Sequence, residues 1–99
     1  MNKNLTDKQK LNKARIEIDK IDSKLLPLIV KRSKMVNLAL ESKTKKSQII
    51  DQKRIKSILT KVAKAAKSKS ADPNLIKSIW KSMIWNFIDY EKKEFKKRK

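Results

Sequence analysis

A periodic apolar seam over residues 11–43 constrains the fold of this chain more than any other feature. Its members are separated by alternating steps of three and four residues, which predicts one long amphipathic helix. The seam, which we expect to face inward, consists of Leu11, Ala14, Ile18, Ile21, Leu25, Leu28, Arg32, Met35 and Ala39. Because the guanidinium of Arg32 stays protonated, a buried seam would require an anionic partner for it, from this chain or from outside it.

The first helix is predicted to begin after the potential N-cap Thr6 and to run to about Ser42. Pro27 lies inside it, where proline removes one hydrogen bond and clashes with the preceding turn. The seam nevertheless continues in phase on both sides of Pro27. We therefore expect one kinked, continuous helix rather than two helices.

Two shorter helices are predicted to follow a polar connection at residues 44–50. The second helix follows Asp51, and its apolar face contains Ile55, Ile58, Leu59, Val62, Ala65 and Ala66. The third begins at Asp72-Pro73, a strong N-terminal signal, and extends to about Phe95. Its inward face contains Ile76, Trp80, Met83, Ile84, Phe87, Ile88 and Glu91. We expect one domain over residues 1–99, with a frayed basic tail at about 96–99.

Composition supports an all-α fold and excludes several kinds of chemistry. The 99 residues include no Gly, no Cys and no His, so disulfides, thiolate metal sites and histidine general bases are excluded. We expect no metal and no cofactor. A core of this size is modest, and dimerisation would stabilise it. No apolar run is long enough to span a membrane, and the N-terminal sequence lacks a signal-peptide core, so we expect a cytoplasmic protein.

The charge balance favours an anionic partner. Lys and Arg number 28 against 10 Asp and Glu, giving a net charge of +18. The lysines are spread around the predicted helices, and neither a helix-turn-helix glycine turn nor interleaved aromatic and basic residues are present. The charge alone fits nucleic acid, an acidic lipid surface or a small dianion, and because these nucleic-acid-binding signals and a membrane-spanning run are lacking, we expect no nucleic acid and no membrane as partner. A basic helical nucleic-acid-binding protein remains the alternative from another functional class.

The arginines of the first helix suggest a site shared between two chains. Arg15 and Arg32 are 17 residues apart, or about 25 Å along a helix, too far to hold one small ligand within one chain. They could meet across an antiparallel pair of first helices. Arg32 and Lys43 lie about 16 Å apart along one face, close enough for long side chains to share a pocket.

Taken together, these residues resemble the all-helical chorismate mutase family. The resemblance covers about residues 11–95, and its closest features are those of the short bacterial branch near the isochorismate-pyruvate lyases. It is carried by the run from Arg15 to Leu26, by Lys31-Arg32, Lys43, Ile49-x-Asp51-x-x-Arg54 and Ile79-Trp80-x-x-x-Ile84, and by Glu91.

The resemblance implies an intertwined homodimer of three-helix chains that rearranges chorismate to prephenate in phenylalanine and tyrosine biosynthesis. It implies that Arg15 binds a substrate carboxylate in the partner's site and that Arg32 binds a carboxylate in its own. Lys43 would contact the ether oxygen and a carboxylate, and Glu91 would contact that oxygen from the other side. Asp51 and Arg54 would lie near the ring and its hydroxyl. Such a reaction requires neither His nor Cys.

Three positions depart from the family's usual pattern. Glu91 replaces a common Gln and can donate a hydrogen bond only when protonated, so we expect it to act as a neutral acid. Ile55 replaces a Glu that often contacts the ring hydroxyl. Pro27 is unusual within the long helix. Isochorismate-pyruvate lyase remains the alternative enzyme, because it binds an isomeric dianion with the same kind of carboxylate clamps.

Overall fold

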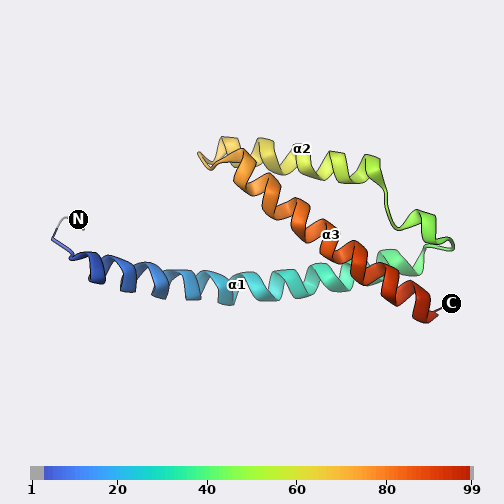
Figure 1. The fold of residues 1–99 in the computed structure, drawn as a ribbon, viewed down its shortest axis with the longest axis horizontal. Coiled ribbons are helices and arrows are strands. Elements are labelled where there is room, and N and C mark those ends of the chain that lie inside the picture. The colour runs from blue at the N-terminus through green and yellow to red at the C-terminus, as the bar shows by residue number, and fades with distance from the viewer. Residues whose placement is uncertain (1–3, 99) are drawn as a thin grey trace. The chain divides into compact units, whose positions relative to one another are not determined.

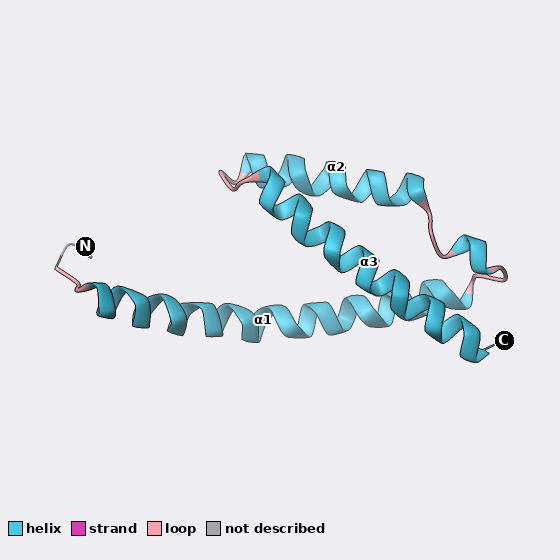
Figure 2. Ribbon diagram, viewed as in Figure 1, coloured by secondary structure: helices cyan, strands magenta, loops and turns pink. Residues whose placement is uncertain are grey.

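The computed structural model describes residues 4–98 and confirms the all-α prediction. These residues form helices α1 (Asp7–Glu41), α2 (Gln52–Ser68) and α3 (Pro73–Arg98), with one 3-10 turn, η1 (Lys46–Gln48), between α1 and α2 (Figures 1 and 2). No strand occurs among the described residues. The chain divides into two compact units, one ending at Lys34 and the other beginning at Met35.

Helix α1 begins at the predicted cap. The Thr6 hydroxyl accepts a hydrogen bond from the Gln9 backbone N–H at 3.1 Å, and the Gln9 side-chain oxygen accepts one from the Thr6 N–H at 2.9 Å. This reciprocal pair is a capping box, which satisfies two backbone donors at the helix start. Pro27 lies inside the helix without ending it, so the prediction of one continuous helix is confirmed.

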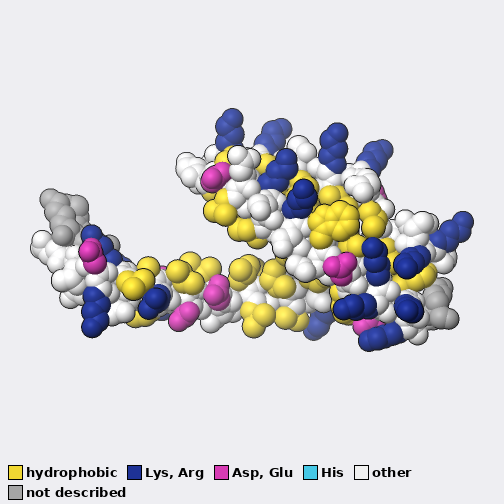
Figure 3. Space-filling view, in the orientation of Figure 1, with side chains coloured by type: hydrophobic (Ala, Val, Ile, Leu, Met, Phe, Trp, Pro, Cys, Tyr) yellow, Lys and Arg dark blue, Asp and Glu magenta, His cyan; other side chains and the backbone are white. Residues whose placement is uncertain are grey.

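The apolar seam of α1 is not buried within the chain, contrary to its description as an inward face. Leu11, Ile21 and Leu28 are 48%, 59% and 62% exposed, and Met35 and Ala39 are also exposed. The residue of α1 that the core buries is Leu40, which lies one position, or about 100° around the helix, from Ala39. The apolar side chains along the N-terminal unit are visible in Figure 3.

The C-terminal unit has its own hydrophobic core, which brings the end of α1 together with α2 and α3. The core consists of Leu40, Ile49, Ile55, Ile84 and Ile88, with Ile50, Ile58, Leu59 and Phe95 packed against it. The most extensive helix contact is between α2 and α3. The predicted apolar faces of these two helices therefore supply most of the core, as expected from their periodicity.

The connection between α1 and α2 is more ordered than its polar sequence suggests. Its organising residue is Gln48, whose side-chain oxygen accepts hydrogen bonds from the backbone N–H groups of Thr44 and Lys45 at 2.7 and 2.8 Å. Ile49 follows and is buried. These contacts fix the segment that links Lys43 to α2.

The sequence predicts the start of α3 correctly but places its end too early. Asp72 caps the start as predicted, because its carboxylate accepts hydrogen bonds from the N–H groups of Asn74 and Leu75. The C-terminal end extends beyond the predicted limit, since residues 96–98 of the expected frayed tail are helical. Residue 99 lies outside the described residues.

The turn between α2 and α3 contains the one positive backbone φ angle reported for the described residues, 60° at Ser70. The Ser70 N–H bonds to the Lys67 carbonyl, and the Ala71 N–H bonds to the Ala66 carbonyl. This is the Schellman pattern, which favours glycine at the left-handed position. A serine there costs free energy because its Cβ crowds the following carbonyl.

We expect Ser70→Gly to stabilise the chain by about 0.5–1 kcal/mol, because it relieves this crowding. The measurement is the midpoint of urea unfolding. Ser68→Gly is the matched control: it lies inside the last turn of α2 and should lower the midpoint. A lower midpoint for Ser70→Gly would contradict the assignment of strain to this residue.

Candidate active site

Glu91 is the buried charged residue of the C-terminal unit. It lies on α3 one turn beyond Ile88 and two turns beyond Ile84, so the face that forms the core also carries Glu91 inward. Only 6% of its surface is exposed. The Lys43 ammonium donates a hydrogen bond to its Oε1 atom at 3.1 Å, forming an ion pair. Glu91 is thereby both buried and partnered.

Lys43 reaches this position from just beyond the end of α1. The sequence predicted Lys43 on the same helix face as Arg32, but α1 ends at Glu41 and Lys43 lies two residues beyond it. The Lys43 N–H still bonds to the Leu40 carbonyl at 3.0 Å. This bond continues the turn and directs the side chain, which is 19% exposed, towards α3. Two residues that are 48 positions apart in the chain are thus brought together.

The Lys43–Glu91 pair can act on a polar ligand atom in two ways. The ammonium supplies a positive charge and several N–H donors, and a carboxyl group supplies a donor when it is protonated. Both groups are shielded from bulk water. Electrostatic interactions are stronger in such a shielded position than at an exposed surface. The two side chains are therefore placed where both could contact one ligand oxygen and stabilise negative charge that develops on it.

Asp51 and Arg54 lie together at the start of α2. The Asp51 carboxylate accepts a hydrogen bond from the Arg54 backbone N–H at 3.0 Å and is the N-cap of the helix. Both residues are exposed. Their placement shows a local structural role for Asp51, while their contact with a ligand remains a prediction. Ile55, which follows Arg54 and replaces a Glu of the family's usual pattern, is buried in the core.

Arg15 and Arg32 lie in the N-terminal unit, on the continuous helix α1. Arg15 is exposed, and Arg32 is partly buried. Because α1 is unbroken between them, they are about 25 Å apart along the helix. The prediction that one chain cannot bring both arginines to the same small ligand is therefore consistent with the fold.

Two residues near the ion pair were not predicted from the sequence. The Tyr90 hydroxyl donates a hydrogen bond to the Asn37 side-chain oxygen at 3.1 Å, in a partly buried position. Asn37 is not a member of the predicted seam, and Tyr90 does not lie on the predicted apolar face of α3. Sequence periodicity alone gives no signal for a polar contact between residues 53 positions apart.

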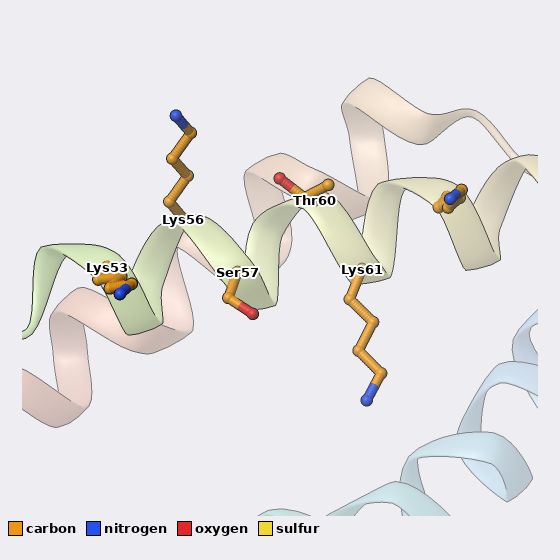
Figure 4. Close-up of a pocket in the computed structure, with 6 residues that line it drawn as sticks. Lys53, Lys56, Ser57, Thr60 and Lys61 are labelled. Carbon is orange, nitrogen blue, oxygen red and sulfur yellow. The ribbon is translucent and has the colours of Figure 1, made fainter.

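The lysines of α2 form a separate feature on its outer surface. A shallow, open hollow there is lined by Lys53, Lys56, Ser57, Thr60, Lys61 and Lys64. Figure 4 shows that Lys56 and Lys61 extend in opposite directions rather than converging. The lysines are exposed, and Figure 3 shows basic side chains projecting from α2. This arrangement does not form a second enclosed site.

Comparison with known families identifies the chain's relatives. A sequence model described as chorismate mutase type II matches residues 14–92, which is most of the chain and includes all six candidate residues. The chain belongs to the chorismate mutase type II family. Membership implies an isomerase that rearranges chorismate to prephenate, and the all-α structure agrees with it. A search of curated proteins finds no significant match.

For this chorismate mutase, the predicted family and reaction are confirmed. The predicted closeness to isochorismate-pyruvate lyases is not supported by the comparisons and remains a prediction. Among the described residues, no helix has the length and apolar character needed to cross a membrane.

Proposed function

We propose that the chain is a homodimeric chorismate mutase in which Lys43 and Glu91 act on the ether oxygen of the substrate. The observation that carries this assignment is the buried Lys43–Glu91 ion pair, in a chain whose family catalyses this reaction. Arg15 and Arg32 bind the two carboxylates of chorismate. Asp51 and Arg54 lie near the ring and its hydroxyl.

The reaction needs conformational control and charge stabilisation rather than a base or a nucleophile. Chorismate must fold its enolpyruvyl arm over the ring before the carbon–oxygen bond breaks and the new carbon–carbon bond forms. Two arginines that hold the carboxylates favour this conformer and supply proximity. Lys43 and Glu91 then stabilise the negative charge that grows on the ether oxygen in the transition state.

The homodimer is supported by the exposed apolar surface of α1. Several large side chains of the N-terminal unit are about half exposed or more: Leu11, Ile16, Ile18, Ile21, Leu25, Leu26, Leu28 and Val30. Five of them, Leu11, Ile18, Ile21, Leu25 and Leu28, lie on one face as the seam, and a continuous apolar stripe of this kind favours association. A second copy paired antiparallel along α1 covers the stripe and brings Arg15 of one protomer towards Arg32 of the other. The single domain over residues 1–99 and the cytoplasmic location also remain predictions.

Glu91 acts as a neutral acid in this proposal. In the substrate-free chain its carboxyl group is paired with Lys43. The protonated group can donate a hydrogen bond to the ether oxygen, whereas the carboxylate cannot.

The donor role of Glu91 is tested with Glu91→Gln. Glutamine keeps a hydrogen-bond donor at this position, so the variant should retain most of the wild-type kcat. Steady-state rates of both proteins provide the measurement. A folded Glu91→Gln chain that has lost most of the wild-type kcat would contradict the role of Glu91 as a donor.

The proposed reaction is tested by product analysis. Purified protein is given chorismate or isochorismate, and prephenate, salicylate and pyruvate are quantified separately. We expect prephenate from chorismate. Salicylate and pyruvate from isochorismate would instead favour the lyase, and no turnover of either substrate would contradict both enzyme assignments.

A further inference from the structure

A second polar contact joins the end of α1 to α3 close to the Lys43–Glu91 pair. The Tyr90 hydroxyl donates to Asn37 Oδ1 at 3.1 Å, and the Arg98 guanidinium donates to the same oxygen at 3.4 Å. Both donors come from α3, and the acceptor lies on α1. None of these three residues has a role in the proposed binding of substrate.

This contact and the ion pair lie on either side of a buried apolar residue. Asn37 and Lys43 are separated by Leu40, which is 1% exposed and packs in the core with Ile84 and Ile88. On α3, Tyr90 directly precedes Glu91. The end of α1 is thus attached to α3 by an apolar contact between two polar ones.

The hydrogen bond between Tyr90 and Asn37 restricts how the end of α1 is oriented against α3. The α1–α3 contact is much smaller than the α2–α3 contact, and Figure 1 shows α3 crossing the end of α1. Two helices that touch over a short region can rotate about the crossing point. Apolar packing at Leu40 is not directional, whereas a hydrogen bond is. A rotation would displace Lys43, which lies just beyond the end of α1.

We propose that Asn37 and Tyr90 are positioning residues that hold Lys43 at the correct distance from Glu91 for catalysis. This inference rests on the proposed function of the ion pair. Misplacement of a catalytic group by about 1 Å can reduce a rate by about 10²-fold. Because the Leu40 packing remains when the hydrogen bond is removed, we expect a smaller displacement and a decrease of about tenfold.

The test compares variants that remove the hydrogen bond with one that keeps its acceptor. Tyr90→Phe and Asn37→Leu should each lower kcat about tenfold, with KM changed less than about twofold, since substrate binding is retained. The double variant should be no worse than Asn37→Leu, because that change already removes the oxygen that accepts from Tyr90 and Arg98. Asn37→Asp keeps the acceptor oxygen and should retain most of the wild-type kcat.

Two further measurements separate positioning from a general loss of stability. Far-UV circular dichroism and thermal melting should show that the assayed variants are folded at the assay temperature. Trp85→Phe, at an exposed position of α3, serves as the control for changing an aromatic residue on this helix and should leave kcat unchanged.

A wild-type kcat for folded Tyr90→Phe would overturn the inference. Additive effects of the two single variants would also overturn it, as would loss of kcat in proportion to loss of folded protein. If the wild-type chain forms no prephenate, the proposed function itself fails. If the wild-type chain is active and the variants match it, only the positioning role fails.

Discussion

Replacing Arg32 by alanine is expected to lower kcat/KM for prephenate formation by about 10³-fold. In the proposed site the guanidinium makes a charge-assisted, bidentate contact to a substrate carboxylate, and removing one partner of a desolvated charge pair costs about 2–5 kcal/mol. The loss should appear in KM and in kcat, because the contact both binds the substrate and favours its reactive conformer. Steady-state kinetics with direct detection of prephenate provide the measurement.

Two variants separate this effect from simple changes of charge. Lys31→Ala removes a positive charge from the adjacent, exposed position of α1 and should leave kcat/KM within about twofold of wild type. Arg32→Lys keeps the charge but loses the planar fork, and it should recover only part of the activity. Near-wild-type activity of folded Arg32→Ala would show that Arg32 does not bind the substrate.

Removing the Lys43 ammonium is expected to reduce kcat by about 10²–10³-fold, the usual effect of losing a donor to a developing oxyanion. Lys43→Met is the most informative change, because it keeps an unbranched side chain while removing the charge. It also leaves the buried Glu91 without the partner that the structure gives it. The measurement is kcat under saturating chorismate, together with thermal melting of each variant.

The control for Lys43 is Lys45→Met in the same connection. Lys45 is exposed, and its backbone N–H rather than its side chain bonds to Gln48, so the change should leave kcat unaltered. An equal loss of activity in both variants would indicate that overall charge, rather than the Lys43 ammonium, controls the rate.

The sequence predicted the helices well because their signals are local. The capping box at Thr6, the Asp51 and Asp72 caps and the apolar face of α3 each depend on residues within a few turns of one another. The same periodicity placed Glu91 on the buried face. Helix starts and amphipathic faces are therefore readable from spacing alone.

Contacts between distant residues were harder to predict. Periodicity could not indicate that Leu40, rather than the neighbouring seam residue Ala39, enters the core. Nor could it pair Tyr90 with Asn37. The partnership of Lys43 with Glu91 was suggested by the family resemblance, since no local pattern connects residues 48 positions apart. Helix α3 continues to Arg98, beyond the predicted limit of about Phe95.

The apolar seam of the long first helix is not covered by the rest of the described chain. Its seam was predicted to be inward, and the exposed side chains of Leu11, Ile21 and Leu28 show that the chain itself does not cover it. A stripe that lacks a covering surface within one protomer is the physical reason for proposing a second protomer.

The central claim, a site completed by Arg15 from the partner protomer, is tested most directly by mixing inactive subunits. Arg15→Ala and Arg32→Ala chains are unfolded together, refolded as a mixture and assayed for prephenate. Half of the dimers should be mixed, and each mixed dimer has one intact site, so activity should recover to about a quarter of wild type. Recovery at that level is the predicted result. Activity no higher than that of the separate variants would contradict the shared site.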